Sequence, residues 1–199
     1  MNCFYKKIES GFTMIELIIS IFILSVAVVG ISSVLSMITI LASNTTDKVV
    51  AIYLAQEGSE IVRNIRDTNW LKMDANPVSG FTWADGLNNC SSGCEADYKS
   101  TATSTWISAG KYLKLDSADG FYNYLAGTDT KFKRKIIVTK LTDVDGDTIN
   151  THIMKVVVQV SWDEKSTVFY SGKLAGDCGS FNCITTEGTL YNWYNYANE

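Results

Sequence analysis

The chain has one proline, one histidine and no excess of positive charge in its 199 residues. Its 17 Lys and Arg residues stand against 21 Asp and Glu residues, a formal net charge of −4. A nucleic-acid-binding protein needs a basic surface, so nucleic acid is not a predicted partner. No nucleophile-plus-base spacing surrounds His152, and no Gly-rich phosphate loop occurs, so the sequence does not predict an enzyme. We interpret His152 as a solvent-side strand residue near a turn.

Charge is also missing from residues 17–46, a run of 30 residues. As a helix rising about 1.5 Å per residue, this run is longer than the roughly 30 Å hydrocarbon core of a bilayer. Lys6 and Lys7 precede the run, and Asp47 and Lys48 follow it. Because positive residues favour the cytoplasmic side, we expect a short cytoplasmic N-terminus, one membrane crossing and an exported remainder.

The start of the run does not have the pattern of an ordinary secretory signal. The apolar core of such a signal has about 7 to 15 residues, roughly half the length found here. Glu16 also lies near the cytoplasmic end, where a carboxylate costs up to roughly 2.5–3.5 kcal/mol in the membrane. The segment Gly11-Phe12-Thr13-Met14-Ile15-Glu16 joins the basic leader to the apolar run. It resembles the class III signal of type IV pilins and pseudopilins; the alternative is a plain membrane anchor with an accidental glutamate.

The resemblance implies a specific maturation and assembly route. Prepilin peptidase would cut after Gly11, and the new N-terminal residue, Phe12, would be N-methylated. Glu16, the fifth mature residue, would accept the cationic amine of a neighbouring subunit's Phe12 in a dry helical core. The implied partners are other pilin subunits, prepilin peptidase, the inner-membrane assembly platform and, before assembly, membrane lipid; no cofactor is implied. The precursor would cross the inner membrane once and then join a pilus or pseudopilus at the cell surface.

Helical periodicity continues from Asp47 to about Trp70. Apolar residues recur at helical spacing and predict a face that packs on a sheet: Val50, Leu54, Ile61 and Ile65. Glu60 with Arg63, and Arg63 with Asp67, have the spacing of ion pairs on the wetter face. Gly58 interrupts the helical pattern, and Asn76-Pro77 ends it.

The period changes to two from Lys131 onward, which predicts strands. We expect an antiparallel meander of strands at residues 131–139, 154–162 and 168–170, with turns at 143–147 and 163–165. Residues 74–110 are interpreted as loop with one short strand near 105–107. The fold class is therefore α+β, a long N-terminal helix packed on a small antiparallel sheet. The expected parts are a leader (1–11), a membrane and assembly helix (12–46), the amphipathic half of the helix (47–72) and a globular β-rich head (73–199).

Further stretches narrow the resemblance to minor pilins of the PilV type and their type II secretion counterparts. These stretches are residues 51–57, 60–67 and 158–162. Many major pilins have a helix-kinking proline in the membrane segment, whereas the only proline here is Pro77. We therefore favour a minor pilin. The alternatives are a type II secretion pseudopilin, or a membrane-tethered adhesin or binding module that uses the aromatic residues at 121–124 and 191–196.

Four cysteines remain once Cys3 leaves with the leader, and an even number in an exported head suggests disulfides. They are Cys90, Cys94, Cys178 and Cys183. Three pairings are possible, and we favour the two local ones because each pair brackets Gly and Ser turn residues. A zinc site formed by all four is the alternative, although neither spacing is the C-x2-C that strongly indicates zinc.

Oxygen-bearing side chains alternate between Asp143 and Asp147, with Asn150 following, as at the start of a calcium loop. Thr148 occupies the position where an EF-hand needs glycine, and Met154 the position of its bidentate glutamate. A polar turn between two strands explains the same residues, and we predict no metal here.

Overall fold

The computed structural model describes residues 11–76, 80–105, 110–141, 152–162, 178 and 182–193. The chain divides into two compact units, residues 1–46 and 47–199, and we call the second the head unit. Helix α1 runs from Met14–Ala75. The described strands form one antiparallel sheet: β1 Cys94–Glu95, β2 Ser104–Thr105, β3 Tyr112–Leu115, β4 Tyr122–Asn123, β5 Thr128–Leu141, β6 Ile153–Trp162 and β7 Cys183–Tyr191. The predicted α+β class, a long N-terminal helix on a small antiparallel sheet, is confirmed.

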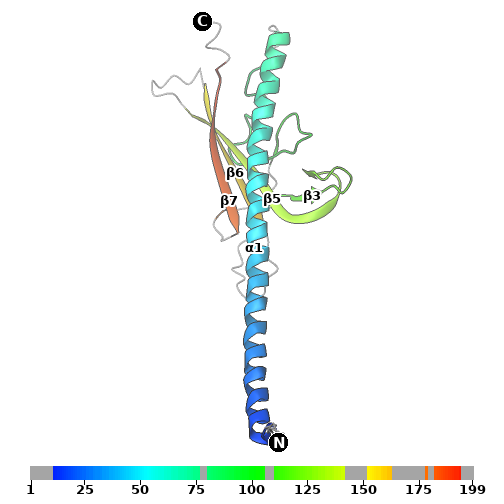
Figure 1. Cartoon of the computed structure of the whole chain (residues 1–199). Helices are drawn as coiled ribbons and strands as arrows, with labels where there is room; N and C mark the ends of the chain where they lie inside the picture. The colour runs from blue at the N-terminus through cyan, green and yellow to red at the C-terminus, as the bar shows by residue number, and fades with distance from the viewer. Residues whose placement is uncertain are drawn as a thin grey trace, which may run out of the picture. The chain divides into compact units, whose positions relative to one another are not determined.

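Strands β5, β6 and β7 are the long strands of the sheet and lie beside α1 in the head unit (Figure 1). β5 pairs with β6 from Phe132 opposite Trp162 to Leu141 opposite Ile153, without a break in register. The predicted inward-facing side chains are buried at every second position: Phe132, Arg134, Ile136 and Val138 on β5, and Met154, Val156, Val158, Val160 and Trp162 on β6. Lys133 and Ser161 depart from the alternation, because they are also buried although they lie on the opposite face of the sheet.

The other strands depart from the sequence prediction. The third long strand is β7, Cys183–Tyr191, which the prediction missed; the expected strand at 168–170 and both expected turns lie outside the described residues. β1, β3 and β4 were also missed, and the short strand expected at 105–107 is β2, Ser104–Thr105. These elements have two to four residues, too short for an alternating pattern to be recognised.

The head half of α1 buries Leu54, Ile61 and Ile65 as predicted, while Val50 is half-buried. The helix ends at Ala75, later than expected, and the Asn76 N–H closes the last turn by donating to Lys72 O at 3.1 Å.

Two ion pairs were expected on the solvent face of α1, and one is present as expected. Arg63 Nη1 lies 2.6 Å from Glu60 Oε1. The expected partner of Asp67 was Arg63, but Asp67 Oδ1 instead lies 2.9 Å from Nε of the neighbouring Arg66. The Arg63–Glu60 pair is at the surface, where such a contact contributes at most about 1 kcal/mol. The Arg66 side chain is only 14% exposed and its Cζ lies 4.4 Å from the centroid of the Trp70 ring, so this packing holds the guanidinium of Arg66 beside Asp67.

One buried guanidinium links α1 to the sheet. Arg134 on β5 is 0% exposed. Its Nη1 donates to Leu54 O at 3.1 Å and lies 3.1 Å from Glu57 Oε2, and its Nη2 donates to Ala96 O at 2.8 Å. A buried charge is stable only when paired and hydrogen-bonded, so these contacts fix where α1 lies on the sheet.

Candidate processing and assembly site

The helix begins with a side-chain cap immediately after the predicted cleavage point. Thr13 is the last residue before α1, and its Oγ1 accepts a hydrogen bond from Glu16 N at 3.4 Å. Its carbonyl accepts the first helical bond, from Leu17 N at 3.2 Å. Thr13 with Glu16 three positions later is the sequence of a capping box, a signal in the sequence that marks the start of this helix. Glu16 therefore lies in the first helical turn, where a negative charge interacts favourably with the helix dipole.

Gly11 and Phe12 precede the cap and are not helical. Phe12 is 81% exposed, and no described atom lies within 4 Å of an ideal Cβ built on Gly11. A bond outside regular secondary structure can be drawn into a peptidase without unwinding a helix. The two residues that flank the predicted cleavage point are exposed, and cutting between them leaves the Thr13 cap intact.

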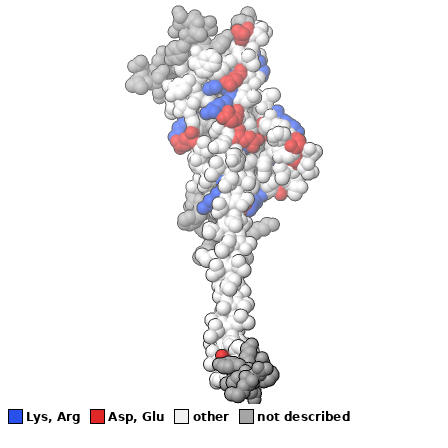
Figure 2. All heavy atoms as spheres, in the orientation of Figure 1, with Lys and Arg blue, Asp and Glu red and all other residues white. Residues whose placement is uncertain are grey.

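The following segment exposes its apolar side chains. From Phe12 to Leu41 the large apolar side chains are between 52% and 82% exposed. Figure 2 shows charged atoms gathered over the head unit and a long uncharged stretch of α1. Among the described residues, α1 is the one helix that is long and apolar enough to cross a membrane, by length and composition. Such a surface needs lipid or other helices around it.

Most hydroxyl groups in this segment are satisfied within the helix itself. Eight Ser and Thr side chains donate to a backbone carbonyl three or four residues earlier: Ser20, Ser25, Ser32, Ser33, Ser36, Thr39, Thr45 and Thr46. In a medium without water, an unsatisfied hydroxyl costs several kcal/mol. These hydroxyls are therefore compatible with an apolar surrounding.

Residues 6–32 match the family model described as the prokaryotic N-terminal methylation motif. The chain carries a prepilin-type N-terminus. This motif supports a type IV pilin-like protein that is processed as a prepilin and serves as a structural subunit. No curated protein and no solved structure matches the chain.

Both local cysteine pairs that the sequence favoured are joined in the structure. Cys90 and Cys94 form one disulfide with Cα atoms 5.1 Å apart, and Cys178 and Cys183 form the other at 5.3 Å. Thr185 Oγ1 on β7 lies 3.3 Å from Cys178 Sγ. The second disulfide therefore lies at the beginning of β7.

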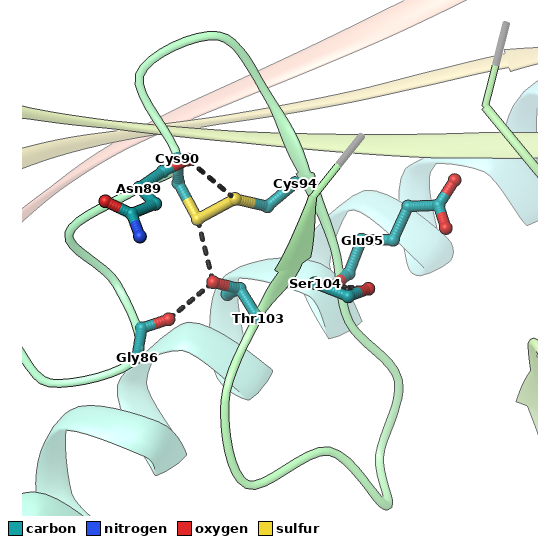
Figure 3. Close-up of a disulfide and its surroundings, with 7 residues drawn as sticks. All are labelled: Gly86, Asn89, Cys90, Cys94, Glu95, Thr103 and Ser104. Atoms are coloured by element: carbon teal, nitrogen blue, oxygen red, sulfur yellow. Dashed lines mark hydrogen bonds between the residues drawn. A yellow bond between two sulfur atoms is a disulfide. The ribbon is translucent and has the colours of Figure 1, made fainter. Parts of the chain in front are cut away.

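The first disulfide ties a loop to the middle of the sheet (Figure 3). Cys90 Sγ lies 2.8 Å from Thr103 Oγ1, which donates to Gly86 O. Cys90 O accepts a hydrogen bond from Val138 N on β5 at 3.1 Å. The bridge thus holds β1 against β5 and positions Ala96 O, which receives the guanidinium of Arg134.

The other candidate residues are not brought together. His152 is half-buried just before β6, and its carbonyl accepts from Asn192 N at 2.7 Å. Within the described residues, no group of three or more His, Cys, Asp or Glu side chains is arranged to hold a metal. The calcium-like turn at 143–150 and the aromatic residues at 194–196 lie outside the described residues.

An aromatic contact forms around residues 119–124. Phe121 packs against Tyr98 with ring centroids 5.0 Å apart, and Tyr98 donates its hydroxyl to Asp119 Oδ2 at 2.5 Å. This hydrogen bond lowers the pKa of Asp119, because it stabilises the charged carboxylate. Phe121 is exposed, whereas Tyr124 is half-buried and donates to Arg134 O at 3.2 Å. The aromatic residues therefore divide between a surface contact and support for the core.

Proposed function

We propose that this chain is a minor pilin, a structural subunit of a type IV pilus or pilus-like filament. Prepilin peptidase cuts after Gly11, Phe12 becomes N-methylated, and the apolar part of α1 then packs among the helices of other subunits. Before assembly the precursor crosses the inner membrane once, with the head unit outside the cytoplasm, and the assembly platform transfers it into a filament at the cell surface.

The observation that carries this proposal is the combination of a methylation motif with an exposed apolar helix that starts at a capped end. The motif covers residues 6–32, and the bond after Gly11 that we propose is cut precedes both the cap at Thr13 and the start of α1 at Met14. A plain anchor needs neither a cleavable bond nor a charge in the first turn. In a filament, Glu16 pairs with the Phe12 amine of the neighbouring subunit, an amine that exists only after cleavage.

A PilV-type minor pilin is favoured over a major pilin by the uninterrupted membrane part of α1, which has Gly30 but no proline. The same feature suits a type II secretion pseudopilin, the second candidate. The two differ in what they assemble: a minor pilin is recovered in filaments sheared from the cell surface, whereas a pseudopilin is required for export of a substrate protein. A tethered adhesin is the third candidate and predicts that the head unit binds a surface ligand.

Processing is tested by intact-mass measurement of the full chain expressed with and without an active prepilin peptidase. With the peptidase, the mass should correspond to a chain beginning with methylated Phe12. Gly11→Val should block the cut, because a branched side chain obstructs access to the scissile bond, and Gly30→Ala is a matched glycine control that should be processed normally. An uncut chain in cells with an active peptidase would overturn the proposal.

A further inference from the structure

Strand β7 forms one border of the sheet (Figure 1). Among the described residues it pairs with β6 on one side and with no strand on the other. The strands at the other borders, β2 and β4, have two residues each, whereas β7 has nine. Short edge strands offer little to pair with, but a long one presents a row of backbone donors and acceptors. β7 is therefore the part of the described sheet best able to accept another strand.

The register identifies which peptide groups of β7 point outward. Trp162 N donates to Asn182 O at 3.1 Å, and Asn192 N donates to His152 O at 2.7 Å. Between these bonds β6 and β7 pair without a shift, so hydrogen-bonded positions alternate along β7. Even-numbered residues thus direct their N–H and C=O groups to β6. The odd-numbered ones direct these groups to the edge that no described strand covers: Cys183, Thr185, Glu187, Thr189 and Tyr191.

A cavity of about 140 Å³ adjoins this edge on the side that faces α1. It exists because Gly188, opposite Val156, has no side chain to fill the space, and no described atom lies within 4 Å of an added Cβ. Gly58 brings α1 close to β6, and the flank of the helix then forms the far wall through Gln56, Ser59, Glu60 and Arg63. A groove between a helix and an edge strand is the geometry used for strand addition.

The charges around the cavity are already paired. Arg63 lies 2.6 Å from Glu60, and Lys155 lies 2.9 Å from Glu187. Neither sign is in excess, and the remaining polar lining consists of amide and hydroxyl groups such as those of Gln56 and Thr186. A charged side chain would enter without a counter-charge, whereas Asn, Gln, Ser or Thr would find hydrogen-bonding partners.

We propose that β7 is a strand-addition site for a neighbouring filament subunit. An extended segment of that subunit pairs with the outward peptide groups of β7 and places an uncharged polar side chain in the cavity at Gly188. This inference rests on the proposed function, since it assigns the contact through which the head unit joins its neighbour.

Two substitutions test the site in the full chain produced in filament-forming cells. Thr189→Pro removes one outward N–H and leaves the ladder with β6 intact, as proline does on an edge strand; Thr189→Ala is its control and keeps the N–H. Gly188→Val fills the cavity and suits a strand. The measured quantity is the ratio of the amount of this subunit in sheared filaments to its amount in membranes. We expect Thr189→Pro and Gly188→Val each to lower this ratio about tenfold, equivalent to about 1.4 kcal/mol, and Thr189→Ala to leave it unchanged.

A photo-cross-linking residue at position 189 identifies the neighbour. We expect it to link to another pilin subunit in filaments, whereas the same residue at Leu125, which is 80% exposed, should not. Normal incorporation of both blocking variants, or links from position 189 only to proteins that are not pilins, would overturn strand addition. Absence of the unmodified subunit from sheared filaments would instead overturn the proposed function. Membrane levels and intact disulfides report whether each variant folds.

Discussion

Gly58 on α1 lies so close to Val158 on β6 that an added Cβ would be 2.8 Å from Val158 Cγ1. The same Cβ would be 3.0 Å from Arg134 Cδ, and the valine has little freedom to move. We expect Gly58→Ala to lower the free energy of unfolding by about 1–3 kcal/mol, despite the gain in helix propensity. Urea unfolding of the full chain in detergent, followed by tryptophan fluorescence, measures this change.

Gly30→Ala is the matched control for that prediction. An added Cβ at Gly30 has no described atom within 4 Å, so the same substitution should leave unfolding of the head unit unchanged. A Gly58→Ala protein as stable as the unmodified one would show that α1 can move away from β6 without cost.

Two replacements of Glu16 should separate the effect of its charge from the effect of its position in the capping-box sequence. Glu16→Ala removes a charge near the membrane, so insertion should be unchanged or easier by up to about 3 kcal/mol. Glu16→Gln keeps a side chain suited to a capping box but removes the charge. If the charge pairs with the neighbour's Phe12 amine, both variants should accumulate in membranes, be cut after Gly11 and fail to enter filaments, because an unpaired amine in a dry core costs several kcal/mol.

The measurement is the amount of each Glu16 variant in sheared filaments relative to membranes. Normal incorporation of Glu16→Gln alongside failure of Glu16→Ala would assign the residue to capping and not to pairing. Thr13→Ala, which removes the cap but keeps the charge, should lower incorporation far less than either variant.

The pairing of the cysteines is checked by peptide mapping without reduction. Each disulfide closes a short loop, so replacing Cys90 and Cys94 together with serine should destabilise the head unit by about 2 kcal/mol, near the low end for disulfides. A link from Cys90 to Cys178 or Cys183 would contradict the local pairing. Four free thiols with one bound zinc per chain would contradict disulfides altogether.

Alkaline pH should destabilise the head unit through Tyr124. Burial of its hydroxyl raises the pKa to about 12, because the charged phenolate is disfavoured away from water. Below the ordinary tyrosine pKa of about 10, Tyr124 is neutral in both the folded and the unfolded chain, and the free energy of unfolding has its full value. Above it the unfolded chain loses the proton first, so the free energy of unfolding should fall by roughly 2–3 kcal/mol as the pH rises to about 12.

Tyr124→Phe is the comparison for the alkaline transition. It loses the hydrogen bond to Arg134 O, at a cost of about 1 kcal/mol at neutral pH. It should lose less stability than the unmodified protein between about pH 10 and 12. Equal losses in the two proteins, measured by urea unfolding at each pH, would show that the Tyr124 hydroxyl is not the responsible group.

The local features of this protein could be predicted from its sequence because neighbouring residues determine them. The uncharged run at 17–46, the motif ending at Glu16 and the alternation along β5 and β6 each follow from a short stretch of chain. The capping-box sequence formed by Thr13 and Glu16 likewise predicts where the helix begins. Helix and strand periodicity depend on backbone geometry, which is the same in every protein.

Only the tertiary structure decided which surfaces meet. From the sequence, Gly58 is only a residue of low helix propensity inside a helix. The structure shows that it lies in close contact with Val158, where the helix packs on the sheet. Arg134 fitted an alternating strand, but nothing nearby in sequence indicated that its guanidinium would be buried against Leu54 O and Ala96 O. β7 became a strand through pairing with β6, because its Thr-rich and Gly-containing sequence is only half-buried and carries a weak pattern of its own. Such contacts join residues far apart in the chain, and their energies depend on neighbours that a local pattern does not contain.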